Sequence, residues 1–188
     1  MLIAVKTFSG KVIVRPDNTR VKDGEDVYMP EFVGRLEWTP VIYTRIIKPG
    51  RSISKKFADR YWDSFNVGIL LFPADLIDGS EEGYACASCL DHSSLLNLEF
   101  HGIKEQSKKY NKIVISSNNN VLLSDNIDIR ESILNSIADV SRFCWLREGD
   151  LLAVEIRSRE ALCDMKSSPF QISGTLDGQT VFDKKIIL

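Results

Sequence analysis

The stretch from Gly34 to Asp75 constrains the fold of this chain most strongly. It opens with an apolar run, 36–47, rich in Val, Ile, Thr, Tyr and Trp, which suit a pleated, half-buried surface. Lys48-Pro49-Gly50 ends this run, and a second apolar run, 67–72, closes the stretch. An uninterrupted apolar run of strand length is typical of a strand buried on both faces. The stretch therefore predicts strand, helix and strand in that order.

Two details refine this prediction. Pro40 lies inside the first run, and proline cannot donate a hydrogen bond to a neighbouring strand, so we expect an edge or a bulge there. Phe57, Tyr61 and Phe65 recur every four residues, which predicts a helix over 55–64 with one apolar stripe. Ser52 or Ser54 can cap that helix.

The remaining elements follow from period and turn signals. A 3.6-residue apolar period predicts a helix over 128–143. The acidic segment 78–84 reads as a loop, and 85–101 is ambiguous. Short strands are predicted over 2–5, 11–14, 112–117, 121–123, 151–156, 170–176 and 180–187, and Asp177-Gly178 predicts a hairpin between the last two. The chain is thus expected to be one β-rich α+β domain over 1–188 with two helices.

Composition excludes several classes of function. Lys and Arg number 24 against 26 Asp and Glu, so no electrostatic footprint for nucleic acid or an anionic membrane exists. The basic residues of 48–60 read as a solvated helix face. No apolar stretch reaches the roughly 18 residues of a membrane span. The N-terminus reads as a strand and not as a signal peptide, so we expect a cytoplasmic protein with reduced cysteines.

Segments spread along the whole chain resemble one family in order and approximate spacing. They are Arg15-Pro16-Asp17, Met29-Pro30-Glu31-Phe32, 56–63 (KFADRYWD), Val67-Gly68-Ile69, Asp75-Leu76, Val140-Ser141-Arg142-Phe143, Gly149-Asp150-Leu151-Leu152 and Gly174-Thr175-Leu176-Asp177-Gly178. Together they resemble the fumarylacetoacetate hydrolase superfamily, in its small bacterial acylpyruvase or isomerase-like branch. The resemblance implies a mixed β-sheet roll with a few short helices, assembled as a homodimer.

The resemblance also implies a chemistry. Family members hold Mg²⁺ or Mn²⁺ with carboxylates, and the ion stabilises the enolate formed from a β-diketo or 2-oxo acid. In this chain the three ligand positions fall on Thr39, Val41 and Leu70, and the catalytic lysine position falls on Ser88. Val and Leu cannot ligate an ion. We therefore expect a divergent, non-catalytic relative that has lost the metal site and carries no cofactor.

Two alternatives remain open from the residues. Glu37, Asp91, His92 and Glu155 could form a relocated site for a hydrolase, decarboxylase or isomerase, and Mg²⁺ or Mn²⁺ would be expected only there. The simpler interpretation is structural: Glu37 is a solvent-facing strand residue, and Glu155 is paired with Arg157 or Arg159.

Cys86 and Cys89 form a C-x-x-C pair that suggests a thiol or zinc-binding module. Zinc would need two further ligands, and Cys144 and Cys163 form no second such pair. Two small, half-buried thiols are the simpler interpretation. The expected partners are a second copy of the chain and a small organic acid, with neither nucleic acid nor membrane.

Overall fold

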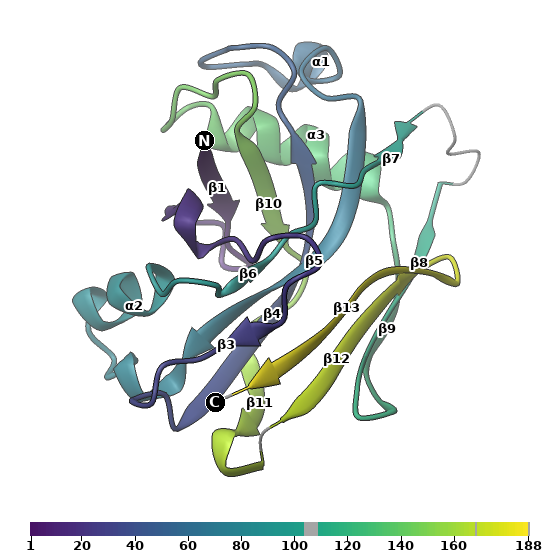
Figure 1. Cartoon of the computed structure of the whole chain (residues 1–188). Helices are drawn as coiled ribbons and strands as arrows, with labels where there is room; N and C mark the ends of the chain where they lie inside the picture. The colour runs from purple at the N-terminus through teal and green to yellow at the C-terminus, as the bar shows by residue number, and fades with distance from the viewer. Residues whose placement is uncertain (104–108, 168, 188) are drawn as a thin grey trace.

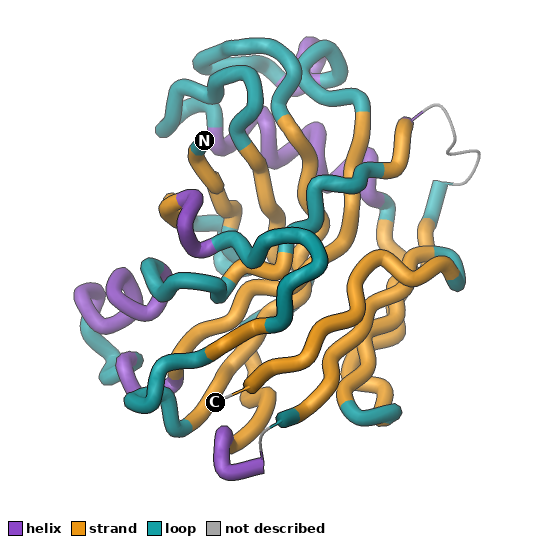
Figure 2. Tube along the Cα trace, in the orientation of Figure 1, coloured by secondary structure: helices purple, strands orange, loops and turns teal. Residues whose placement is uncertain are grey.

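The computed structural model of the protein describes residues 1–103, 109–167 and 169–187. Two β-sheets face each other, as Figures 1 and 2 show, with helices at one end and along one side of the larger sheet. The strands are β1 (Leu2–Lys6), β2 (Val12–Pro16), β3 (Val27–Tyr28), β4 (Arg35–Arg45), β5 (Ser64–Pro73), β6 (Ser94–Leu95), β7 (His101–Gly102), β8 (Asn111–Ser117), β9 (Asn120–Ile127), β10 (Leu151–Glu155), β11 (Glu160–Asp164), β12 (Phe170–Leu176) and β13 (Gln179–Ile187).

The larger sheet runs β2-β1-β10-β4-β5-β6, with β11 also paired to β4 and β7 to β5. It is mixed, because β1 and β10 are parallel while the other pairs are antiparallel. The smaller sheet runs β3-β13-β12-β8-β9. The helices are α1 (Lys55–Ala58), α2 (Glu81–Ser88) and α3 (Ile129–Val140), with the 3₁₀ turns η1 (Asp17–Thr19), η2 (Ala74–Leu76) and η4 (Met165–Ser167).

The larger sheet curls so that its two ends meet. A parallel bridge joins Arg20, which follows β2, to Ser94 in β6. The strand-rich architecture agrees with the sequence patterns, and its mixed, curled sheet agrees with the roll that the family resemblance implies.

Strand β4 is central in the larger sheet, and the edge predicted at Pro40 is confined to the point where the neighbour of β4 on one side changes. Its partner on one side changes along its length: β11 pairs with 35–38, and β10 pairs with 41–45. Pro40 lies between these two pairings, and its carbonyl accepts a hydrogen bond of 3.1 Å from the N–H of Ile156. The missing proline N–H thus falls where the neighbouring strand changes, and the ladder tolerates it.

The two faces of the larger sheet build two separate apolar cores. The main core lies between one face, helix α3 and the smaller sheet, and includes Trp38, Ile69 and Ile137. The small core lies on the opposite face and consists of Ile3, Val5, Val41, Tyr43, Leu70, Phe72, Ala87, Leu96, Leu151 and Ala153. Every residue of β5 is buried, as its continuous apolar run predicts.

The helix predicted over 128–143 is present as α3, and the helix predicted over 55–64 is present only in its first turn, as α1. Helix α1 ends at Ala58, and Phe57 is 44% exposed. The apolar stripe fails because Phe65 already belongs to β5 and pairs with His101 of β7, so tertiary strand pairing overrides the local period. Ser54 occupies the N-cap position without a side-chain cap bond.

A third helix, α2, replaces the end of the predicted acidic loop and the start of the ambiguous segment. Ser80 caps it by accepting a hydrogen bond from the N–H of Gly83, and Glu81 and Glu82 lie favourably in its first turn. That capping signal is present in the sequence. The number of helices is therefore three and not two in the described part of the chain.

The predicted C-terminal hairpin is present as β12 and β13, with Asp177 and Gly178 at positive φ, as such a turn requires. No helix within the described ranges is long and apolar enough to cross a membrane.

Candidate functional site

The three positions assigned to metal ligands lie together on the small-core face. Thr39 of β4 is paired directly with Leu70 of β5, and Val41 lies two residues beyond Thr39 on the same strand. Because side chains alternate along a strand, these three share one face. All three are 0% exposed.

Their atoms do not form a cation site. The Thr39 hydroxyl donates a hydrogen bond of 2.8 Å to the carbonyl of Arg157, while Val41 and Leu70 pack in the small core. Mg²⁺ and Mn²⁺ prefer oxygen ligands, chiefly carboxylates, and the two aliphatic side chains offer none. These residues therefore do not fit the family's metal. Within residues 1–103, 109–167 and 169–187, no group of three or more His, Cys, Asp and Glu could hold a metal ion.

A fully buried arginine crosses this face. Arg15 reaches from β2 to the far end of the curled sheet, where its guanidinium donates to the carbonyls of Leu71 (2.8 Å), Ser88 (3.0 Å) and Ser93 (3.1 Å) and to the hydroxyl of Ser94 (2.8 Å). Burial lowers the pKa of Arg15 to about 10. All four acceptors are uncharged, so hydrogen bonds compensate the desolvation of this cation.

The Arg15 guanidinium also lies 4.7 Å from the centre of the Phe72 ring. A second guanidinium, that of Arg159, lies 5.3 Å from the ring centres of both Phe72 and Tyr84. These two rings stack with their centres 5.8 Å apart. Two cations and two aromatic rings thus occupy the space beside the three aligned positions.

Two carboxylates complete this polar cluster. Glu37 forms an ion pair with Arg159. Glu155, at the end of β10, accepts a hydrogen bond of 2.8 Å from the backbone N–H of Phe8. Burial raises the pKa of Glu155, and the nearby charges of Arg15 and Arg159 oppose that rise. Burial also raises the pKa of Tyr84.

The four candidates for a relocated site divide between two places. Glu37 and Glu155 lie in the cluster around Arg159. Asp91 instead accepts a hydrogen bond from the side chain of Asn18 in η1, and the backbone N–H of His92 donates to the Asn18 carbonyl (3.5 Å). Asp91 and His92 are thus bound to another segment of the chain.

Ser88, the position of the family's lysine, lies against the Arg15 cluster. Its side chain is buried, and its hydroxyl donates to the carbonyl of Tyr84 within α2 (2.9 Å). Its own carbonyl accepts from Arg15. Ser88 is therefore fixed by hydrogen bonds in the wall of the small core.

The four cysteines fall into two classes. Cys86 and Cys89 are exposed free thiols at the end of α2, whereas Cys144 and Cys163 are partly buried. Burial raises the pKa of Cys144, and it raises that of Cys163 to about 12. The prediction that Cys86 and Cys89 are half-buried is wrong, because α2 turns their side chains outward.

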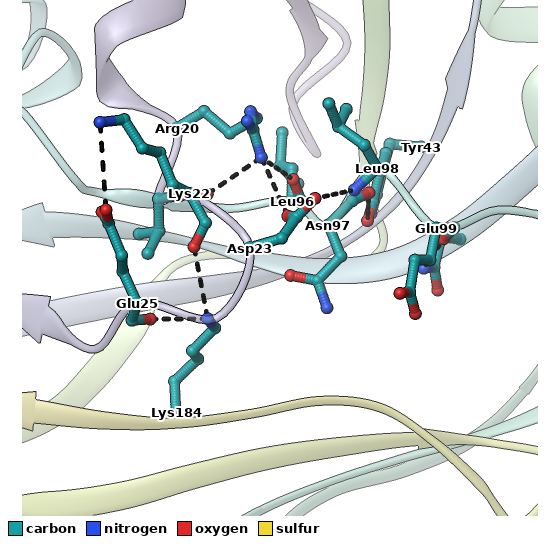
Figure 3. Close-up of polar contacts among 12 residues, drawn as sticks. Arg20, Lys22, Asp23, Glu25, Tyr43, Leu96, Asn97, Leu98, Glu99 and Lys184 are labelled. Carbon is teal, nitrogen blue, oxygen red and sulfur yellow. Dashed lines mark hydrogen bonds and ion pairs between the residues drawn. The ribbon is translucent and has the colours of Figure 1, made fainter.

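Figure 3 draws polar contacts that anchor the loop 20–26, whose Val21 lies in the main core, and the sequence did not reveal them. Arg20 contacts Asp23 and the carbonyl of Leu96. The Tyr43 hydroxyl donates to the Asn97 carbonyl (2.7 Å), and burial raises the pKa of Tyr43 well above its usual value.

On the other side of the same loop, the amine of Lys184, which is buried, donates to the carbonyls of Lys22 (3.4 Å) and Glu25 (2.6 Å) (Figure 3).

Sequence analysis does not identify Arg15 and Tyr84 as members of the cluster. It offers Arg159 as a partner of Glu155, and the structure places Arg159 near Glu155 but in an ion pair with Glu37. The Arg15-Pro16-Asp17 segment resembles the family, but nothing local shows that the Arg15 side chain is buried, and nothing local marks Tyr84, since the contacts of both come from distant parts of the chain.

Comparison with solved structures identifies the architecture. A fumarylacetoacetate hydrolase family protein from Yersinia pestis, so described provisionally, matches with a TM-score of 0.84 at 18% identity, over 99% of this chain and 92% of that one. Fumarylpyruvate hydrolase from Pseudomonas aeruginosa, solved with Mn²⁺ and pyruvate, matches with a TM-score of 0.83 at 16% identity, over 100% and 90%.

A third neighbour is 5-carboxymethyl-2-hydroxymuconate delta-isomerase from Mycobacterium smegmatis, with a TM-score of 0.78 at 11% identity, over 99% and 78%. No protein-family model matches the sequence, and no curated protein matches it. The order of the family-like segments, the curled mixed sheet and these neighbours agree, and the chain has the fold of the fumarylacetoacetate hydrolase superfamily.

Proposed function

We propose that this chain is a single-domain, cytoplasmic member of the fumarylacetoacetate hydrolase superfamily that does not carry out the family's metal-dependent chemistry and acts by binding a partner, in the first place a second copy of itself. The donor chemistry at Thr39, Val41 and Leu70 carries the proposal. These positions meet on one face, yet they present one hydroxyl, already bonded to a carbonyl, and two aliphatic side chains.

The packing around these positions supports the same conclusion. The face where a metal and its substrate would lie is filled by protein atoms. They are the fully buried side chains of the three positions, the Phe72–Tyr84 stack and the Arg15 guanidinium. A divalent ion placed there would lose its hydration without gaining charged ligands, which is unfavourable.

The test combines metal binding with turnover. The purified full-length chain is titrated calorimetrically with Mn²⁺ and Mg²⁺ and assayed with acylpyruvates and oxaloacetate. We expect no saturable heat of binding and no turnover above buffer, and we expect a dimer by sedimentation. Turnover that requires Mn²⁺ or Mg²⁺ would overturn the proposal.

A second candidate is a metal-independent hydrolase, decarboxylase or isomerase acting on a 2-oxo acid at the Glu155 cluster. The observation that favours it is a half-buried carboxyl of raised pKa beside two arginines and a tyrosine, because such groups gather at functional sites. A small organic acid would have to displace Glu37 from Arg159 to bind there.

The same assays separate the two candidates. Turnover that persists in a chelator and is lost in Glu155→Gln would establish the second. Asp91→Asn is the matched control, because Asp91 lies outside the cluster and contacts Asn18 instead.

A further inference from the structure

A pair of exposed thiols at the end of α2 remains outside both functions proposed above. Cys86 lies in the last turn of the helix, and Cys89 is its C-cap residue. The N–H of Cys89 donates to the carbonyl of Cys86 at 3.0 Å, so the turn closes between residues i and i+3. Side chains three residues apart eclipse one another in such a turn. The two thiols therefore project from the same side of one tight turn.

We propose that Cys86 and Cys89 form a reversible dithiol–disulfide couple that hydrogen peroxide oxidises. The backbone permits the bond, because the ends of a four-residue turn lie within about 7 Å and a disulfide spans Cα atoms about 4.4–6.8 Å apart. The turn also places its four side chains on two different sides. Ala87 and Ser88 face the protein and are buried, while the two cysteines face solvent.

Zinc is a poorer occupant of this pair. A structural zinc site uses four ligands, and no third His, Cys, Asp or Glu joins the pair within the described residues. A disulfide needs only the two sulfurs.

Cys89 is the nucleophile in this proposal. It interacts electrostatically with the Arg15 guanidinium, the buried cation whose Nε–H donates to the carbonyl of the adjacent Ser88. A nearby cation stabilises the negative charge that develops on the departing oxygen as a thiol sulfur attacks peroxide. Cys86, one turn away, is then the resolving thiol.

The chemistry balances in two steps. The Cys89 thiolate attacks one peroxide oxygen, the O–O bond breaks, and Cys89 becomes a sulfenic acid while the departing hydroxide takes up a proton as water. The Cys86 sulfur then attacks the Cys89 sulfur, the S–O bond breaks, and a second water leaves with the Cys86 proton. Two thiols are oxidised and one peroxide is reduced, and an external dithiol reverses the change by exchange.

The protein supplies its own internal comparison. Cys144 and Cys163 are partly buried, and burial raises the pKa of each, so both are poor thiolates. The structure thus predicts that two of its four cysteines react and two do not.

The test uses the reduced full-length protein and one equivalent of hydrogen peroxide. We expect loss of two hydrogen atoms in the intact mass, loss of two titratable thiols, and a peptide cross-linked between Cys86 and Cys89. A Cys144→Ser, Cys163→Ser double variant should behave identically. Reaction at 86 and 89 should be at least about tenfold faster than at 144 and 163 in the native protein, and this difference should vanish in denaturant.

Single variants test the assigned order. In Cys86→Ala the sulfenic acid on Cys89 should persist and react with dimedone, whereas Cys89→Ala should be labelled several-fold less. Both are surface changes, so the fold should survive, which circular dichroism checks. Four unreacted thiols, or irreversible oxidation of single cysteines without a cross-link, would overturn the proposal. Equal dimedone labelling of the two variants would refute Cys89 as the nucleophile. None of these outcomes bears on metal binding or turnover.

Discussion

At the scale of single residues, Arg15 organises the face that would be catalytic in a metal-dependent relative. A buried guanidinium is costly unless its donors are bonded, and here four bonds to uncharged groups join β2 to β5, α2 and β6. The same side chain lies against Phe72 and close to Glu155 and Cys89. One residue thus fixes the closure of the curled sheet and sets the electrostatics around it.

Arg15→Met should destabilise the protein by about 3–5 kcal/mol, because the buried carbonyls of Leu71 and Ser88 lose their donor. The measurement is equilibrium unfolding in urea. Arg35→Met is the control: its side chain is 67% exposed and 3.7 Å from Asp75, so the change should stay within about 0.5 kcal/mol. Equal effects of the two substitutions would contradict this role for Arg15.

Glu155→Gln should stabilise the protein at neutral pH. Since burial raises the pKa of Glu155 above its unfolded value, ionisation of this carboxyl favours unfolding, and the wild type loses stability as pH rises through the folded pKa. Glutamine does not ionise and keeps an oxygen acceptor for the Phe8 N–H. Urea midpoints should be compared from about pH 4, just below the unfolded pKa of about 4.3, up to about pH 8. They should diverge towards the neutral end.

Glu131→Gln should change the stability at neutral pH in the opposite direction. Hydrogen bonds from Lys55 and Asn135 lower the pKa of Glu131, so its ionised form favours folding above the unfolded pKa. That variant should be less stable than wild type at neutral pH, and the difference should disappear in acid. Parallel pH profiles for the two variants would refute the assigned pKa directions.

At the scale of elements, the β4–β5 pair is the centre of the molecule. Trp38 and Ile69 enter the main core from it, and Val41 and Leu70 enter the small core, so both faces are buried. Where another segment packs closely against this pair, a side chain larger than that of glycine does not fit. Gly68 is one such contact, opposite Val41 in the ladder.

Gly68→Ala should cost about 1–3 kcal/mol by overpacking. An added Cβ would lie 2.3 Å from the Leu95 carbonyl oxygen and 2.9 Å from a methyl carbon of Leu96. Gly34→Ala is the matched control, because its nearest neighbour would be the Asp75 carboxylate at 3.5 Å, an ordinary contact. Thermal unfolding of both variants decides the matter, and a Gly68→Ala protein as stable as Gly34→Ala would show that β6 can move aside.

At the scale of the whole molecule, the fold is that of a family of metal-dependent enzymes, but the side chains at the assigned ligand positions do not fit a metal ion. The architecture matches that of hydrolases and isomerases, and the positions that resemblance assigns to ligands do meet on one face. The residues at those positions belong to an apolar core. A fold can persist after its chemistry is lost, because the strand pairs and cores that define it do not need the ligands.

Restoring carboxylates tests the assigned positions. The variant Thr39→Glu, Val41→Glu, Leu70→Asp places three charges in a buried site, so it should be strongly destabilised alone and recover thermal stability as Mn²⁺ is added. The amide variant Thr39→Gln, Val41→Gln, Leu70→Asn has the same shape without charge and should not respond. If Mn²⁺ stabilises the carboxylate variant no more than the amide variant, these positions do not form a metal site.

Elements whose signals are local could be predicted from the sequence. Neighbouring residues are enough to predict helix α3, the Asp177-Gly178 hairpin and the buried strand β5. The sequence also shows directly that Thr39, Val41 and Leu70 carry no charge. Only the tertiary structure shows the early end of α1, the position of Pro40 between two strand pairings and the burial of Arg15. These depend on partners far along the chain. Arg15, for example, bonds groups between 56 and 79 residues away. Local period and turn chemistry carry no information about which distant strand will supply a hydrogen bond, so only the closure of the sheet could place this cation.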